Sequence, residues 1–138
     1  MPTSADLLLD TSAAIALVHD QHPSHEAVRA AVRGHVLGLA GHAAYETYSV
    51  LTRLPGPARV SSGAAAAIIE RAFPASAPLS VSAARGAVAL FAAAGIAGGA
   101  VYDALVALVA REAAVPLLTC DRRAMSTYAA VGVHARLV

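Results

Sequence analysis

The sequence predicts an α/β protein in which helices flank a central, twisted, mainly parallel sheet of about five strands. Apolar runs of strand length alternate along the chain with longer segments of helical periodicity, the pattern of a parallel sheet connected by helices. The chain is also 57% apolar and only 14% charged, so it can cover both faces of such a sheet. Its 138 residues predict a single domain spanning 1–138.

The expected strands are short apolar runs at residues 6–9, 35–40, 79–81, 115–119 and 133–137. The expected helices lie between them. They cover 12–18, a segment opened by Ser24 and ended by Gly34, then 43–54, 61–73, 82–94, 100–113 and 122–130. Serine at a helix start and glycine at a helix end are common boundary signals, and proline or glycine follows most of the other segments.

Four of the nine acidic residues stand in apolar surroundings, where an unpaired charge is costly to bury. Asp10 ends "LLLD", Glu46 lies inside "AAYETYSVL", Asp103 lies inside "GGAVYDALVALVA", and Asp121 ends "VPLLTCD". Two of them end predicted strands and two stand near helix starts. Because the carboxyl ends of parallel strands line one edge of a sheet, we expect all four carboxylates to converge there.

Carboxylates that converge repel one another unless a cation neutralises them. The ligands here are oxygens with no Cys or His alongside, which favours Mg²⁺ or Mn²⁺ over zinc. Such an ion can polarise a phosphoryl oxygen and activate a bound water. Each acid taken alone is better explained as a helix cap or a buried ion-pair partner, but four at the same edge favour a metal site.

Four segments resemble the motifs of the PIN-domain nucleases, and more narrowly the VapC-type toxins of bacterial toxin/antitoxin pairs. They are "LLLDTSAAIAL", "YETYSVLTRLP", "GGAVYDALVALVAREA" and "LLTCDRR", and the resemblance covers nearly the whole chain. It implies a three-layer PIN-like fold and Mg²⁺- or Mn²⁺-dependent endoribonuclease activity. By this resemblance the catalytic and metal-binding residues are Asp10, Glu46, Asp103 and Asp121, supported by Thr11, Ser12 and Thr119.

The resemblance also implies the partners, namely an RNA substrate, a cognate VapB-type antitoxin and a second copy of the chain in a homodimer. Arg53 is the basic residue that follows the second motif. Arg122 and Arg123 stand where some family members carry a further acid, which leaves open whether one or two ions bind. These arginines are candidates for contact with RNA phosphate, although a solvated helix start explains Arg122 and Arg123 equally well.

Other readings of the sequence remain open. A catalytically degenerate PIN fold would only bind RNA or protein. A metal-dependent phosphatase on a related α/β sheet generally uses a lysine, and all ten cations here are arginines. Tyr45, Tyr48 and Tyr102 flank two of the acids and could stack on a base, but core packing is the commoner fate of helical aromatics.

The sequence also bears on the location of the protein. Cys120 is the only cysteine, so an intrachain disulfide is excluded and a reducing compartment fits. The chain begins without a basic segment followed by a long apolar run, and glycines interrupt its longest uncharged stretch. We therefore expect a cytoplasmic protein without a signal peptide or membrane span.

Overall fold

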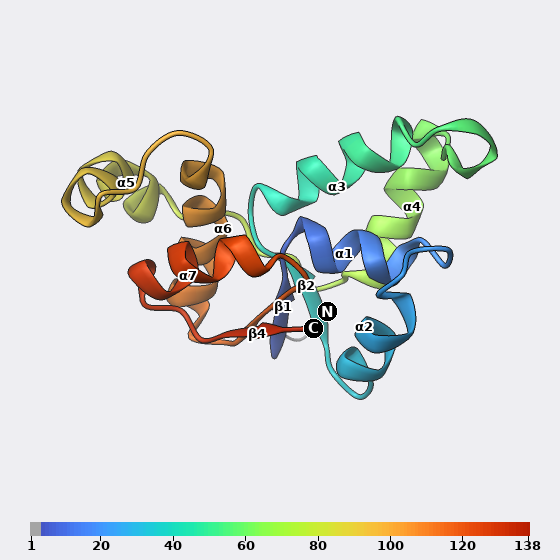
Figure 1. The fold of residues 1–138 in the computed structure, drawn as a ribbon, viewed down its shortest axis with the longest axis horizontal. Helices are drawn as coiled ribbons and strands as arrows, with labels where there is room; N and C mark the ends of the chain where they lie inside the picture. The colour runs from blue at the N-terminus through green and yellow to red at the C-terminus, as the bar shows by residue number, and fades with distance from the viewer. Residues whose placement is uncertain (1–3) are drawn as a thin grey trace.

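The computed structural model describes residues 4–138, which form a parallel sheet flanked by helices (Figure 1). The sheet has four strands in the order β2-β1-β3-β4, and every neighbouring pair is parallel. Their bounds are β1 Leu7–Leu9, β2 Leu37–Leu39, β3 Leu117–Thr119 and β4 Ala135–Leu137. The first three of these strands are fully buried, as expected for apolar runs in a sheet covered on both faces.

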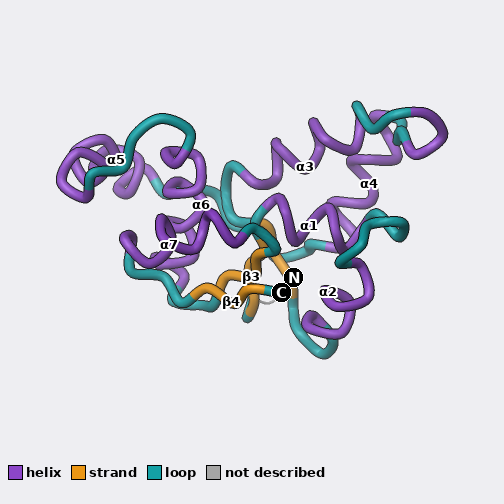
Figure 2. The backbone as a smooth tube through the Cα atoms, viewed as in Figure 1, coloured by secondary structure: helices purple, strands orange, loops and turns teal. Residues whose placement is uncertain are grey.

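All the predicted helices are present in the described part of the chain, and Figure 2 shows that they dominate the fold around the short strands. The α-helices are α1 Thr11–Val18, α2 His25–Val32, α3 Ala43–Thr52, α4 Ser62–Ala72, α5 Val81–Ala94, α6 Ala100–Ala113 and α7 Met125–Val131. Two short 3₁₀ helices, η1 Gly56–Ala58 and η2 Arg122–Ala124, precede α4 and α7. The predicted helix at 122–130 is therefore a 3₁₀ turn followed by an α-helix.

The strand predicted at 79–81 is wrong. Ser80 instead caps α5, because its side chain accepts a hydrogen bond from the backbone N–H of Ala83 at 3.0 Å, and Val81 is the first residue of that helix. A serine that satisfies a free backbone donor favours a helix start over a strand. Leu79 of this short run packs against the core, whereas Val81 is 70% exposed.

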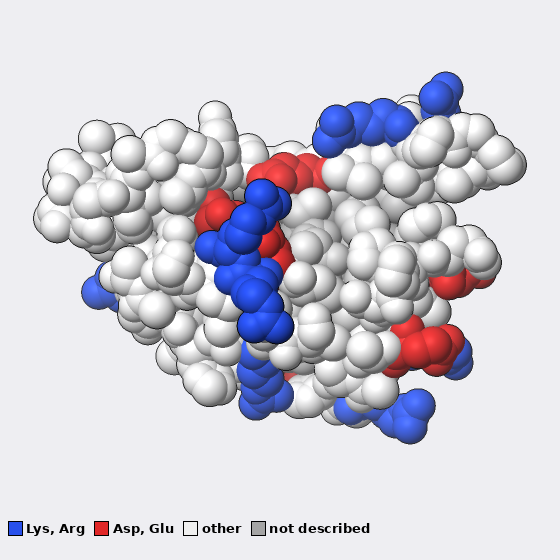
Figure 3. All heavy atoms as spheres, in the orientation of Figure 1, with Lys and Arg blue, Asp and Glu red and all other residues white. Residues whose placement is uncertain are grey.

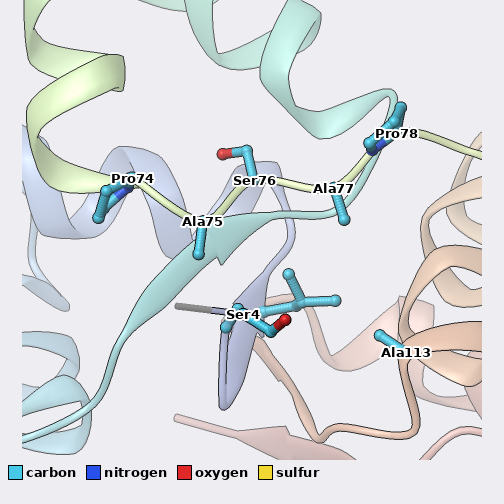
Figure 4. A pocket seen from close by; sticks show the side chains of 9 residues that line it. Ser4, Pro74, Ala75, Ser76, Ala77, Pro78 and Ala113 are labelled. Carbon is cyan, nitrogen blue, oxygen red and sulfur yellow. The ribbon is translucent and has the colours of Figure 1, made fainter. Parts of the chain in front are cut away.

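The chain does run beside β2 a few residues earlier, as Figure 4 shows for the segment from Pro74 to Pro78. The backbone N–H of Ala75 donates to the carbonyl of Leu37, and that of Ala77 donates to the carbonyl of Leu39, each at 3.0 Å. The two prolines lack an N–H and bound the segment on both sides, so the pairing stays short. The sheet accordingly has four strands rather than about five.

The core explains how α3 comes to lie beside the sheet. The main cluster joins the leucines of β1, β2 and β3 to the buried face of α6. A smaller cluster of Ile15, Leu51 and Ala65 joins α1, α3 and α4. Because this second cluster packs α3 against α1, the first turn of α3 lies near the carboxyl end of β1.

The topology places a switch point between β1 and β3. From β1 the chain passes through α1 and α2 to β2 on one side, whereas β3 and β4 join on the other side. In open α/β sheets, ligands bind at the carboxyl ends of the strands where the order reverses in this way. Among the residues described, no helix is both long enough and apolar enough to cross a membrane.

Candidate active site

Asp10 follows β1 directly and caps α1, and its residue is only 4% exposed. Its Oδ1 accepts hydrogen bonds from the Ser12 hydroxyl at 2.6 Å and from the Ala13 backbone N–H at 3.0 Å. Its Oδ2 accepts one from the hydroxyl of Tyr128 at 2.6 Å. A carboxylate offers about four lone-pair sites, so these three donors fix the orientation of Asp10 and leave one site on Oδ2.

Asp121 lies beyond the end of β3, the strand next to β1. Its Oδ1 accepts a hydrogen bond from the backbone N–H of Arg123 at 3.0 Å, and the Arg123 Nε lies 3.7 Å from the same oxygen. Thr119 Oγ1 accepts from the backbone N–H of Asp121 at 3.0 Å. The Ser12 hydroxyl accepts from the N–H of Cys120 at 2.9 Å and lies 3.3 Å from Thr119 Oγ1. Ser12 and Thr119 thus tie the two strand ends together.

Glu46 and Asp103 come from the first turns of α3 and α6. His42, one turn before Glu46, places its Nε2 at 3.2 Å from Glu46 Oε1. Negative side chains are favoured in the first turn of a helix, where backbone N–H groups are unpaired. The helix starts therefore help to hold these two carboxylates near the strand ends.

The pKa of Asp103 shows that the carboxylates interact electrostatically. Burial, followed by the negative charges of Asp121, Asp10 and Glu46, raises it from 3.8 to about 6, while Arg123 partly offsets the rise. Burial and the neighbouring negative charges both disfavour the ionised form of Asp103, and a nearby cation would favour it. Figure 3 shows acidic atoms gathered in the middle of one face, beside a stripe of arginine.

A single pocket of about 260 Å³ collects the predicted acids from four parts of the sequence. It is lined by Asp10, Thr11, Ser12, Glu46, Asp103, Val106, Asp121 and Tyr128; we call it the carboxylate pocket. Within residues 4–138, no three His, Cys, Asp or Glu side chains are grouped closely enough to hold a metal ion as they stand. The pocket is thus an open arrangement of oxygen donors rather than a closed ligand cage.

The predicted arginines differ in their positions. Arg122 and Arg123 lie in η2, directly after Asp121. Arg123 is almost fully exposed, and its guanidinium lies near the Asp121 carboxylate. Arg53 is the C-cap of α3, whereas Glu46 lies in the first turn. Most of α3 therefore separates Arg53 from Glu46, and none of the three arginines lines the carboxylate pocket.

Tyr128 is a residue of the site that the sequence pattern did not indicate. This residue of α7 is 1% exposed, and its hydroxyl is the partner of Asp10 Oδ2. Burial, followed by the charge of Asp10, raises the pKa of the Tyr128 hydroxyl far above its ordinary value, so the hydroxyl keeps its proton and donates it in the hydrogen bond. Its place in "MSTYAAV" looks like an ordinary core position, and only the packing of α7 reveals the contact.

Comparison with known proteins identifies the family. The PIN domain family matches residues 7–130. The chain is 45% identical to Ribonuclease VapC27 of Mycobacterium tuberculosis (strain ATCC 25618 / H37Rv) over 128 residues, 93% of each protein. It is 43% identical to Ribonuclease VapC40 of Mycobacterium tuberculosis (strain CDC 1551 / Oshkosh) over 131 residues, 94% of this chain and 96% of that protein.

Solved structures agree on the fold. The crystal structure of FitAcB from Neisseria gonorrhoeae matches with a TM-score of 0.65 at 17% identity, covering 94% of this chain and 95% of that one. PAE2754 from Pyrobaculum aerophilum matches with a TM-score of 0.55 at 22% identity, covering 96% of this chain and 92% of that one.

The match to the PIN domain family also removes the phosphatase alternative. PIN-domain nucleases generally depend on a divalent metal ion. The chain therefore belongs to the PIN-domain family and, within it, to the VapC ribonucleases.

Proposed function

We propose that the protein is a VapC-type endoribonuclease toxin whose Asp10, Glu46, Asp103 and Asp121 hold the Mg²⁺ or Mn²⁺ ion that RNA cleavage requires. The observation that carries the proposal is the carboxylate pocket itself, which gathers four acids distant in sequence and where burial, together with the three neighbouring carboxylates, raises the pKa of Asp103. A partly buried cluster of carboxylates is stabilised by a bound cation.

The donor set fits a hard divalent ion. The polar side chains lining the pocket supply oxygen atoms only, which suits Mg²⁺ or Mn²⁺ rather than a softer metal. Mg²⁺ usually retains several waters and takes one or two carboxylates directly. This coordination matches an open pocket in which no three acidic side chains are grouped as a ligand set.

The residues have distinct roles in this proposal. Asp10 is the best oriented carboxylate and presents the remaining lone-pair site of its Oδ2. Ser12 and Thr119 fix the distance between the two strand ends. A bound divalent ion supplies charge stabilisation at the phosphodiester and a more acidic water. Arg122 and Arg123, which directly follow Asp121, attract the RNA backbone.

The proposed partners are RNA, a cognate VapB-type antitoxin and a second copy of the chain. Val81 and Val88 on α5 are strongly exposed. Aliphatic surface of this kind favours a protein partner. This exposed surface lies on α5, which supplies no residue to the carboxylate pocket.

The deciding experiment is RNA cleavage by the purified protein, with 5′ ends mapped by sequencing, in Mg²⁺, in Mn²⁺ and in EDTA. Asp10→Asn removes one charge at the best oriented ligand, so we expect cleavage to fall by roughly a hundredfold or more, as it should in EDTA. Asp20→Asn is the matched control, because Asp20 is exposed and lies outside the pocket. Cleavage at the wild-type rate in EDTA or by Asp10→Asn would rule out the metal site.

A further inference from the structure

Two large aromatic side chains are exposed beside the carboxylate pocket. Tyr45 is 72% exposed and Tyr102 is 55% exposed. Each is next in sequence to an acid of the pocket, since Tyr45 precedes Glu46 and Tyr102 precedes Asp103. Neither ring is packed in the core, although core packing is the commoner fate of aromatic residues in helices. An exposed aromatic forgoes the stabilisation that burial would bring, which marks this surface as a place where something binds.

His42 joins the two tyrosines into one surface. Its ring stacks on Tyr102, with centroids 5.4 Å apart and planes at 28°, and meets Tyr45 edge to face at 6.3 Å and 80°. We call His42, Tyr45 and Tyr102 the aromatic rim. It is built from the starts of α3 and α6, the same two helix starts that carry Glu46 and Asp103.

The aromatic rim is continuous with the carboxylate pocket. A hollow of about 360 Å³ is lined by His42, Glu46, Gly99, Tyr102 and Asp103. Glu46 and Asp103 also line the carboxylate pocket, so the two spaces share a wall. A Cβ added at Gly99 would meet no atom within 4 Å, which shows that the hollow is open on that side.

We propose that the aromatic rim binds an unstacked nucleobase of single-stranded RNA, adjacent to the phosphodiester that lies in the carboxylate pocket. This inference rests on the proposed function and names its substrate as single-stranded RNA. Bases splayed out of a single strand stack on tyrosine and histidine rings. Every base has such a face, so the rim anchors the strand with little sequence preference. A regular duplex keeps its base faces stacked and cannot use the rim.

The position and chemistry of the rim favour a base over a protein partner. The rim consists of rings with polar edges next to an acidic site, whereas the exposed aliphatic residues Val81 and Val88 lie on α5. An aliphatic face suits a protein neighbour. Stacked aromatic rings at the edge of a phosphate-cleaving pocket suit the base that flanks that phosphate.

The test measures binding of a fluorescein-labelled, random-sequence 12-nucleotide RNA to the full chain by anisotropy in EDTA, where cleavage is suppressed. Tyr45→Ala and Tyr102→Ala should each weaken binding by about fivefold to a hundredfold, the usual effect of removing a stacking partner. Tyr102→Phe keeps the ring and should bind like the wild type. Val88→Ala is the control, because Val88 is 77% exposed on α5, a helix that supplies no residue to the rim or to either hollow.

A second readout locates the base directly. RNA of the same length carrying 5-iodouridine should crosslink to Tyr45 or Tyr102 on irradiation, as mapped by peptide mass spectrometry. Wild-type affinity in both alanine variants, with no crosslink at either tyrosine, would overturn the inference, while RNA cleavage by the wild type would leave the proposed function standing. If the wild type shows no metal-dependent cleavage but its RNA binding depends on the two tyrosines, the proposed function is wrong and the aromatic rim still binds a base.

A protein partner at the rim gives a different result. If Tyr45→Ala combined with Tyr102→Ala converts a dimer to a monomer in light scattering and leaves RNA affinity unchanged, the rim is an interface between two copies and the inference is wrong. Tighter binding of a 12-base-pair duplex than of the single strand would also contradict it, since the bases of a duplex cannot reach the rings.

Discussion

Asp103 links the pH dependence of stability to the carboxylate pocket. Burial and three neighbouring carboxylates raise its pKa from 3.8 to about 6 in the folded protein. The folded state therefore binds this proton more tightly than the unfolded state does. Its contribution to stability is fully present below pH 4 and is lost as the pH rises through about 6.

Asp103→Asn should reverse this loss, because asparagine is neutral at every pH. At pH 8 in EDTA we expect the free energy of unfolding to rise by about 1 kcal/mol, a value reduced to allow for screening by solvent. At pH 4 the variant should match the wild type, since Asp103 is then protonated in the folded state. Urea denaturation at the two pH values checks this, and an equal gain at both would argue against electrostatic repulsion.

Tyr128 is the residue through which α7 acts on the pocket. Tyr128→Phe keeps the ring in the core and removes the hydroxyl that donates to Asp10 Oδ2 at 2.6 Å. If Asp10 binds the ion, loss of this donor leaves only Oδ1 hydrogen-bonded and the carboxylate less firmly oriented, and the affinity for Mn²⁺ should fall by about tenfold or more. Calorimetric titration of the protein with Mn²⁺ measures it.

The control for Tyr128 is Tyr48→Phe, which removes a hydroxyl from a tyrosine that does not line the carboxylate pocket. That variant should bind Mn²⁺ like the wild type. Equal affinities in both variants would mean that Tyr128 only fills the core.

At the scale of elements, the edge of the sheet depends on a glycine in β2. A Cβ at Gly38 would overlap the backbone carbonyl of Ala75, in the segment that pairs with this strand. Gly38→Ala therefore forces the 75–77 segment away from β2 and should lower the free energy of unfolding by about 1–3 kcal/mol.

Gly86→Ala, in the interior of α5, is the control for Gly38. The added methyl group there would meet no atom within 4 Å, so the better helix propensity of alanine should stabilise the protein by about 0.5–1 kcal/mol. Urea denaturation of both variants separates the two effects. A neutral Gly38→Ala would show that the pairing of 75–77 with β2 is not tight.

At the scale of the whole molecule, we expect RNA binding to depend more on where the charges lie than on the net charge. The net charge is only +1, and Arg122 and Arg123 directly follow Asp121, an acid of the carboxylate pocket. If both arginines contact phosphates, replacing them with alanine should reduce the slope of log K against log salt concentration by about 1.4, at about 0.7 for each contact with a single strand. RNA binding measured across a salt series tests this.

The control for the salt series is Arg29→Ala, which removes an exposed arginine from α2, a helix that supplies no residue to the pocket. It should leave the slope unchanged. An unchanged slope in the Arg122→Ala, Arg123→Ala variant would mean that these arginines are simply solvated.

The sequence alone determined the fold class, the helices, four of the strands and the family. These follow from short-range signals: the period of apolar residues, helix caps, and acids placed directly after strands. The same signals brought Asp10 and Asp121 to one sheet edge, since the carboxyl ends of parallel strands share an edge. The prediction of a strand at 79–81 was wrong because a short apolar run occurs both in strands and at helix starts.

Only the tertiary structure decided which side chains meet across the fold. Tyr128 and Asp10 are 118 residues apart, and their hydrogen bond depends on how α7 is placed by its packing against α6 and β4. The exposure of Tyr45 and Tyr102, and the stacking of His42 between them, likewise depend on how α3 and α6 are placed. Local periodicity does not encode such contacts, because they arise from the packing of separate elements around a shared core.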